Sequence, residues 1–216
     1  MLGKTISHFA TINASGGKLF STLSGLTKTT SPFLFLIEQA AARFSELDLA
    51  AEEFRTSTGL LASQTGEIEN NIRSISRDMA EFGVDVAKAT SAAKTLTTTF
   101  GDQFMASNKA NVEYIALMKE NLGVAEEDSA KVLSNFMGMN KMSSETARYM
   151  TAQAASLAKA AGVPFAKVMK EVANASGETL AAIKGSVPQL IKAAVTAERL
   201  GTDLNKVGAA AGKLLD

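Results

Sequence analysis

The feature that most constrains the fold is an apolar repeat with a period of 3.5 residues, which runs through residues 33–100. Counting in alternating steps of three and four from Phe33 to Phe100 gives twenty positions, of which eighteen are apolar. Only 13 of the 48 other positions in this range are apolar, so composition alone does not produce the pattern. A seven-residue repeat kept over many heptads requires helices to supercoil around one another. The range therefore predicts a long coiled coil whose seam needs a partner helix.

We expect the partner helices to come from copies of the same chain that run parallel to one another. Flanking positions carry few complementary charges, so nothing in them specifies a different partner chain. The large side chains of Phe82 and Phe100 fit the core of a trimer more readily than that of a dimer, so we expect three copies, with six as the alternative. The oligomer seam is predicted at Ile68, Ile72, Ile75, Met79, Phe82, Val86, Ala89, Ala93, Leu96 and Phe100.

Two breaks divide the heptad region. Residues 1–32 form a Ser/Thr-rich helical segment with a weaker register, and Pro32 predicts a helix start because proline fits a first helical turn but not a helix interior. A second weak point is predicted at residues 58–66, where two seam positions are Thr and two glycines disfavour helix. The alternative is a hairpin within one chain that turns at this point and packs residues 33–57 antiparallel on residues 67–100.

Residues 101–216 predict a module of short helices separated by glycines. Gly123, Gly162 and Gly201 follow Ala- or Leu-rich helical stretches and recur at equal intervals of about 39 residues, which predicts a weak helical repeat. A left-handed glycine is expected at each of these helix ends. Pro164 suits the start of the helix that follows Gly162. These four residues are the predicted helix joints. A buried helix face is predicted at Val163, Phe165, Val168, Met169 and Val172.

The side-chain inventory predicts an all-α structural protein rather than an enzyme. The chain has no cysteine and one histidine, His8, which cannot build a nucleophilic triad or a multi-histidine metal site, so we expect no cofactor and no metal. The 22 basic and 22 acidic residues cancel, so we expect no specific nucleic-acid ligand. The longest strongly apolar run, residues 33–37, is too short to span a bilayer.

Residues 208–214 resemble a phosphate-binding loop but depart from its pattern twice. Only three residues separate Gly208 from Gly212, and Lys213 is followed by Leu rather than Ser or Thr. The two glycines lie one helical turn apart, which indicates a close approach by another helix.

From about Asn111 onward the sequence resembles a helical region of tail tape-measure and related internal virion proteins of contractile-tailed bacteriophages. The resemblance covers about half the chain and rests on a helix that ends Leu-Gly-Val at residues 122–124, a Met-Ser-x-Glu-x-Ala start at residues 142–147, an Ala-Gly-Val-Pro joint at residues 161–164 and a closing Leu-Leu-Asp. It implies a virion protein in the tail lumen or baseplate, which sets tail length and contacts the baseplate hub and tail-tube proteins. Members of this family are generally much longer than this chain.

Two other functions fit parts of the pattern. A coiled-coil adaptor or signalling scaffold of bacterial origin would carry heptads, but it would not account for the glycine-punctuated helices. A membrane-active exported effector would use Ala/Gly-rich amphipathic helices for transient contact with a host membrane, without a stable span. Genes for tail-tube, sheath and baseplate proteins beside this one would favour the virion protein, and binding of liposomes would favour the effector.

Overall fold

A computed structural model describes residues 32–183 and 185–213, and every regular element in these ranges is a helix. The all-α prediction is therefore confirmed for this part of the chain. The chain divides into two compact units, residues 1–46 and residues 47–216. Of the first unit, only the beginning of helix α3 (Pro32–Thr58) lies in the described ranges. Nearly all of the segment predicted at residues 1–32 lies outside the described residues.

Helix α3 begins at Pro32, where the sequence predicts a helix start. It ends at Thr58 because Gly59 adopts a left-handed backbone (φ +70°), and helix α4 (Ala62–Asp78) begins three residues later. Within the second unit, the end of α3 runs antiparallel to α4. Arg55 donates to Glu69 at 2.9 Å, and Arg73 pairs with Asp48 at 3.6 Å.

The predicted weak point at residues 58–66 is thus a chain reversal between residues 58 and 62. The rest of that range lies inside α4. The structure has the turn of the hairpin alternative, but α4 ends at Asp78, so no single helix over residues 67–100 packs on α3.

The continuous helix expected over residues 67–100 is wrong. The chain forms α4, a 3₁₀ turn η3 (Ala80–Phe82) and helix α5 (Val86–Phe100), and α4 and α5 contact each other. Gly83 ends the turn in a left-handed conformation (φ +80°), and the Asp85 carboxylate caps α5 by accepting a hydrogen bond from the Lys88 amide at 2.9 Å. The chain therefore reverses inside the predicted rod.

The remaining elements are all helices of four to eighteen residues. They are α6 (Phe104–Ser107), α7 (Lys109–Leu122), α8 (Glu126–Asn140), α9 (Ser144–Ala161), α10 (Phe165–Ala173), α11 (Gly177–Ala182), α12 (Val187–Leu200) and α13 (Leu204–Lys213).

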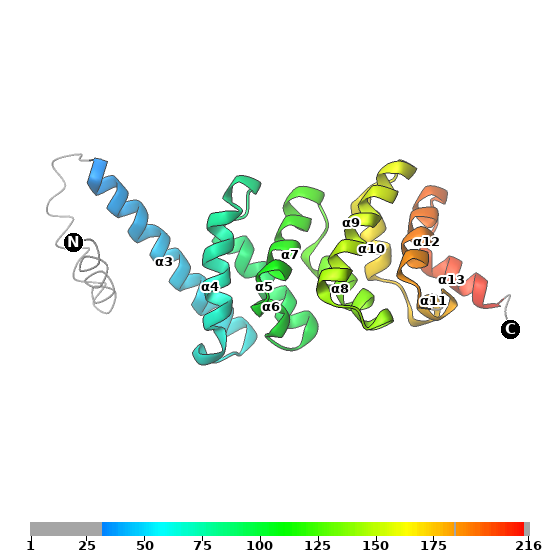
Figure 1. Ribbon diagram of the computed structural model, residues 1–216, viewed down its shortest axis with the longest axis horizontal. Helices are drawn as coiled ribbons and strands as arrows, with labels where there is room; N and C mark the ends of the chain where they lie inside the picture. Colours follow the sequence, from blue (N-terminus) through cyan, green and yellow to red (C-terminus); the bar gives the residue numbers. More distant parts are fainter. Residues whose placement is uncertain (1–31, 184, 214–216) are drawn as a thin grey trace. The chain divides into compact units, whose positions relative to one another are not determined.

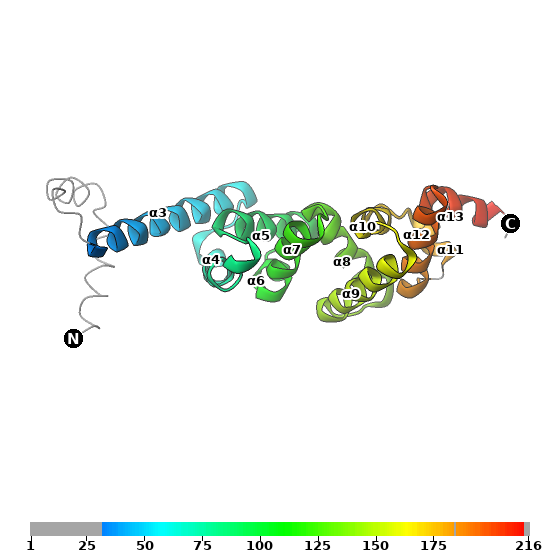
Figure 2. The same cartoon turned by 90° about the horizontal axis from the view of Figure 1, so that it is seen from above.

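Four pairs of consecutive helices make up most of the second unit, and each pair packs on the next in chain order (Figures 1 and 2). We call α4/α5 pair 1, α7/α8 pair 2, α9/α10 pair 3 and α12/α13 pair 4. Across neighbouring pairs, the first helices α4 and α7 contact each other, as do α9 and α12. The second helices α5 and α8 also contact each other, and so do α8 and α10. Short helix α6 packs against α4, α5 and α7, and α11 packs against α13.

The predicted seam is buried between helices of one chain. Its residues at 0–8% exposure are Ile68, Ile72, Ile75, Val86, Ala89, Ala93 and Leu96. Met79 and Phe100 are half-buried against the same core, and Phe82 is 47% exposed. A helix that packs on a neighbouring helix needs apolar side chains at three- and four-residue spacing whether that neighbour belongs to the same chain or to another copy. The reason for expecting a partner copy at this seam therefore disappears.

The buried face predicted in the second half is present in α10. Val168, Met169 and Val172 are fully buried, while Val163 and Phe165 are half-buried and pack against the core. Asn135 of α8 donates its side-chain amide to the Val172 carbonyl at 3.0 Å, which ties the second helices of pairs 2 and 3 together. Packing on adjacent pairs thus buries the apolar face of each short helix.

Candidate functional site

The joint within each pair is built on the same backbone turn. Gly123, Gly162 and Gly201 follow α7, α9 and α12 and have φ values of +66°, +69° and +65°, a region that residues with a Cβ rarely occupy. The amide after each glycine bonds back to the helix that has just ended, as Val163 does to the Ala158 carbonyl at 3.0 Å. The glycines therefore satisfy helix-end carbonyls and redirect the chain.

Gly83 adds a fourth joint that the sequence reasoning missed. It precedes Gly123 by nearly the same interval as separates the later joints, is followed by Val84 as Gly123 is by Val124, and also has a positive φ. The Val84 amide bonds back to the Met79 carbonyl at 3.2 Å. The sequence does contain the glycine at the expected interval. It was missed because the residues on either side, at positions 82 and 86, also fit the heptad.

The residues after the joints start the second helices. Pro164 is the N-cap of α10, as the sequence suggests. The Asp203 carboxylate accepts from the backbone amides of Asn205 (2.7 Å) and Lys206 (3.3 Å) at the start of α13. Oxygen acceptors at these positions satisfy amides that have no partner within the helix.

Pairs 1 and 2 are joined by ion pairs at the surface. Lys109, the first residue of α7, donates to Asp78 at 2.7 Å and to the Ser74 hydroxyl at 2.8 Å, and lies 3.4 Å from Glu113. The pKa of Asp78 lies well below the ordinary carboxyl value, chiefly because Asp78 accepts a hydrogen bond from Lys109. The same contact raises the pKa of Lys109. The Lys109 and Asp78 side chains are each 36% exposed, so water screens their ion pair and it fixes register more than it adds stability.

Glu126 is the buried acid of this region, at 5% exposure. Its carboxylate accepts from Ser91 of α5 at 2.6 Å, from Thr95 at 3.3 Å and from Lys119 at 3.1 Å. The residue lies in the first turn of α8, where a negative charge is favourable. These partners account for the buried charge, so Glu126 is a structural link between pairs 1 and 2.

Two polar contacts link α7 to α9, the first helices of pairs 2 and 3. Tyr114 donates to the buried Thr151 hydroxyl at 3.2 Å, and Arg148 donates to the side-chain carbonyl of Asn111. Asn111 is 1% exposed and donates in turn to the Met105 carbonyl at 3.2 Å. Burial raises the pKa of Tyr114 to about 12. The sequence reasoning gave no role to these residues, because no motif marks them.

Helix α11 meets pair 4 at a close crossing on Gly208 of α13. A Cβ built on Gly208 would lie 2.3 Å from Oγ1 of Thr179 in α11. Asn205, one turn before Gly208, accepts from the Ser176 amide at 2.7 Å and from the Thr179 hydroxyl at 3.0 Å. The close helix approach predicted from the Gly208 and Gly212 spacing thus occurs at Gly208; the side-chain surroundings of position 212 lie outside the described residues.

A shallow, mostly apolar groove between α9 and α12 is lined by Leu157, Ala160, Ala161, Lys192, Val195 and Thr196. Residues 32–183 and 185–213 bring together no group of three acidic, His or Cys side chains that could hold a metal, and His8 lies outside these ranges. No helix among the described residues is long and apolar enough to cross a membrane.

The fold defines a class: a helical array of pairs that repeat about every 39 residues and contact mainly their neighbours. Comparisons with protein-family models, curated proteins and solved structures gave no match. The candidate functional elements are therefore the joints and the contacts between pairs.

Proposed function

We propose that the chain is a structural component of a contractile bacteriophage tail, a tape-measure protein or part of one. It acts inside the tail tube, where it sets tail length, and it contacts the baseplate hub and the tube wall. The observation that carries this proposal is the regular succession of helix pairs, whose joints at Gly83, Gly123, Gly162 and Gly201 are almost evenly spaced. Two of these joints, Leu122-Gly123-Val124 and Ala161-Gly162-Val163-Pro164, are the motifs that carry the resemblance to tape-measure proteins.

A repeating helical unit suits a ruler for a physical reason. The rise of an α-helix is fixed at about 1.5 Å per residue, and neighbouring helices pack about 8–10 Å apart, so the length of either arrangement follows from the number of residues or pairs. Each pair here contacts mainly the pairs beside it, so adding or removing a period leaves most other contacts in place. The chain thus has the modular construction that length setting requires.

The proposal does not include the long parallel coiled coil expected from the heptad. Seven of the ten predicted seam residues are at most 8% exposed in one chain, and a partner copy would reach them only after pair 1 had opened. The role in the tail then rests on the array and on the resemblance, not on threefold packing at this seam.

Deleting one period from the gene in its phage tests the proposal. Removing residues 124–162 joins Gly123 directly to Val163 and keeps a complete joint. We expect the tail to shorten by about 58 Å if this segment lies along the lumen as a helix, or by about 10 Å if the pairs stay folded. Electron microscopy of many tails measures either change.

A duplication of the same segment is the matched control and should lengthen the tail by the same amount. Mass spectrometry of the purified tails checks that the altered chain is present. Unchanged tail length with the altered chain present would contradict the tape-measure role, and absence of the unaltered chain from purified tails would contradict any tail role.

An adaptor or scaffold is the second candidate, because stacked helix pairs present extended surfaces to partner proteins. The specific observation is the open groove between α9 and α12, where Leu157 is 39% exposed. Neighbouring genes separate the two candidates. Tail-tube, sheath and baseplate genes beside this one favour the tail protein, and their absence favours the scaffold.

A further inference from the structure

The two halves of the helical array carry opposite charge. Residues 47–140 hold 14 acidic and 8 basic side chains, a net charge of −6. Residues 141–213 hold 10 basic and 5 acidic side chains, a net charge of +5. The change of sign falls at the loop between α8 and α9, which is also the boundary between pairs 2 and 3. The neutral total of the chain conceals this division.

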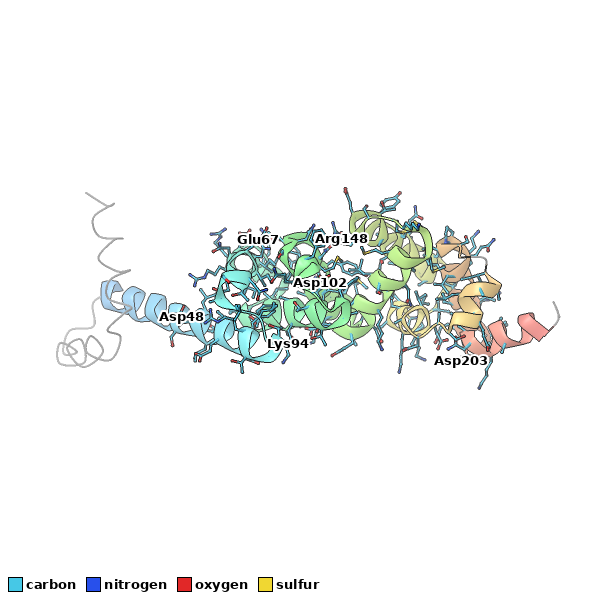
Figure 3. The ribbon with its side chains drawn as sticks, turned by 90° about the horizontal axis from the view of Figure 1, so that it is seen from below. Asp48, Glu67, Lys94, Asp102, Arg148 and Asp203 are labelled. Atoms are coloured by element: carbon cyan, nitrogen blue, oxygen red, sulfur yellow. The ribbon has the colours of Figure 1, made fainter. Side chains whose placement is uncertain are left out.

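The ion pairs within the chain leave the two charges largely uncompensated. Every salt bridge between described residues lies between positions 48 and 126, so it uses bases of the acidic half. Acids such as Glu67 and Asp102 remain exposed there, and Figure 3 labels both. In the basic half no described base forms a salt bridge. The exposed ones are Lys141, Lys159, Lys167, Lys170, Lys192, Arg199 and Lys206.

We propose that two copies of the chain associate antiparallel, so that the acidic half of each faces the basic half of the other. A two-fold axis then pairs both halves at once, and the charges of −6 and +5 nearly cancel across each contact. Exposed apolar side chains on both halves supply anchors for the contact. They are Phe104 (76%) and Leu122 (46%) in the acidic half and Tyr149 (63%) and Leu200 (71%) in the basic half.

Two other arrangements fit the charges less well. Parallel copies in register would place the two acidic halves side by side and the two basic halves side by side. Like charges in juxtaposition oppose association. A polyanion such as DNA would be attracted to the basic half but repelled by the acidic half of the same array. A second copy offers both signs in nearly equal amounts. This inference stands independently of the tail role.

Sedimentation velocity of the full chain at micromolar concentration tests the association. We expect a dimer in 50 mM NaCl and a dissociation constant at least about tenfold larger in 500 mM NaCl, because the Debye length shortens with salt. The triple variant Lys167→Glu, Lys170→Glu and Lys192→Glu should be monomeric at both salt concentrations. The matched variant with arginine at the same three positions should remain a dimer, and circular dichroism should show that both variants are folded.

Energy transfer between single labels tests the orientation, since the chain has no cysteine of its own. Ala87 and Thr196 are exposed and lie in opposite halves. Copies labelled through Ala87→Cys should transfer energy efficiently to copies labelled through Thr196→Cys, and weakly to other Ala87→Cys copies. The reverse order of efficiencies, a monomer at both salt concentrations or a dimer insensitive to salt would overturn the proposal. Binding of a 30-base-pair DNA by a chain that stays monomeric would overturn it in favour of a polyanion partner.

Discussion

At the scale of single residues, the packing of the helices in the second unit depends on a few polar groups and on one close approach. Tyr114 donates its hydroxyl to Thr151 at 3.2 Å between α7 and α9. Gly208 lets α13 approach Thr179 of α11 more closely than any side chain would allow. Each of these two contacts leads to a prediction about stability, and the geometry gives the direction of the change.

Burial raises the pKa of Tyr114 to about 12, so the folded chain favours the neutral phenol. A raised pKa contributes stability that is complete below the unfolded value near 10 and is lost as pH rises from about 10 to about 12. The variant Tyr114→Phe has no such group, so its unfolding free energy should fall less over this window, by about 1–2 kcal/mol. Urea unfolding at pH 9 and pH 11.5 measures this difference. The exposed Tyr149→Phe is the control, and an equal loss in the Tyr114→Phe and unaltered chains would contradict the account.

Gly208→Ala should destabilise the chain by about 1–3 kcal/mol, because the added methyl group would overlap Thr179 and force α11 and α13 apart. Gly138→Ala is the matched control, since position 138 is exposed within α8 and no atom lies within 4 Å of its added Cβ. That variant should gain up to about 1 kcal/mol from helix propensity. Thermal unfolding of both variants checks the two predictions. A Gly208→Ala variant as stable as the unaltered chain would show that the close crossing is absent.

At the scale of elements, the distinction between a rod and a helix pair lies at the turn between α4 and α5. Ile75 is fully buried in α4, whereas Phe82 is 47% exposed just before the joint at Gly83. Both residues would be buried in a continuous coiled-coil seam. Substitutions at these two positions therefore report which structure forms.

Ile75→Asp should cost several kcal/mol and unfold pair 1, because it buries an unpaired carboxylate. Phe82→Asp should change stability by about 0.5 kcal/mol or less, as expected for a surface position. Circular dichroism with chemical denaturation measures both variants. Equal, severe loss of helix in the two variants would indicate that Phe82 is also buried, which the helix pair does not allow.

The sequence pattern was sufficient for the all-α class, the start of α3 at Pro32 and the glycine-ended helices before Gly123, Gly162 and Gly201. It was not sufficient for the packing of the heptad region. Apolar side chains at three- and four-residue spacing mark a buried helix face, and that face is buried equally well by the next helix of one chain or by another copy. Local spacing therefore predicted that Ile75 is buried, but not whether the helix that covers it belongs to the same chain.

The reversal at Gly83 and the contacts between pairs were harder to predict for a different reason. Gly83 lay within an apolar register that continued on both sides of it, so the glycine looked like one outward-facing position of a long helix. Asn111 and Arg148, and Glu126 and Ser91, meet across long stretches of sequence. Their roles depend on how pairs stack, which no local motif specifies.

At the scale of the whole molecule, the second unit is a modular array of helix pairs. Neighbouring pairs bury the apolar face that a rod would have left for other copies, and the charge of each half is available for association. This arrangement underlies both proposals. The array itself rests on the premise that pair 1 closes on itself within one chain.

A distance between α4 and α5 tests that premise most directly. Glu67 and Thr98 are exposed and lie at similar numbers of residues from the turn that joins α4 to α5, so spin labels on Glu67→Cys and Thr98→Cys would report whether the two helices pack together. Adjacent packed helices lie about 8–10 Å apart, so with flexible label arms the distance should be below about 25 Å. One continuous helix would separate the labels by about 47 Å at about 1.5 Å per residue. Double electron–electron resonance on diluted, doubly labelled chains should give the short distance, and a distribution centred near the value of about 47 Å for a continuous helix would contradict the account.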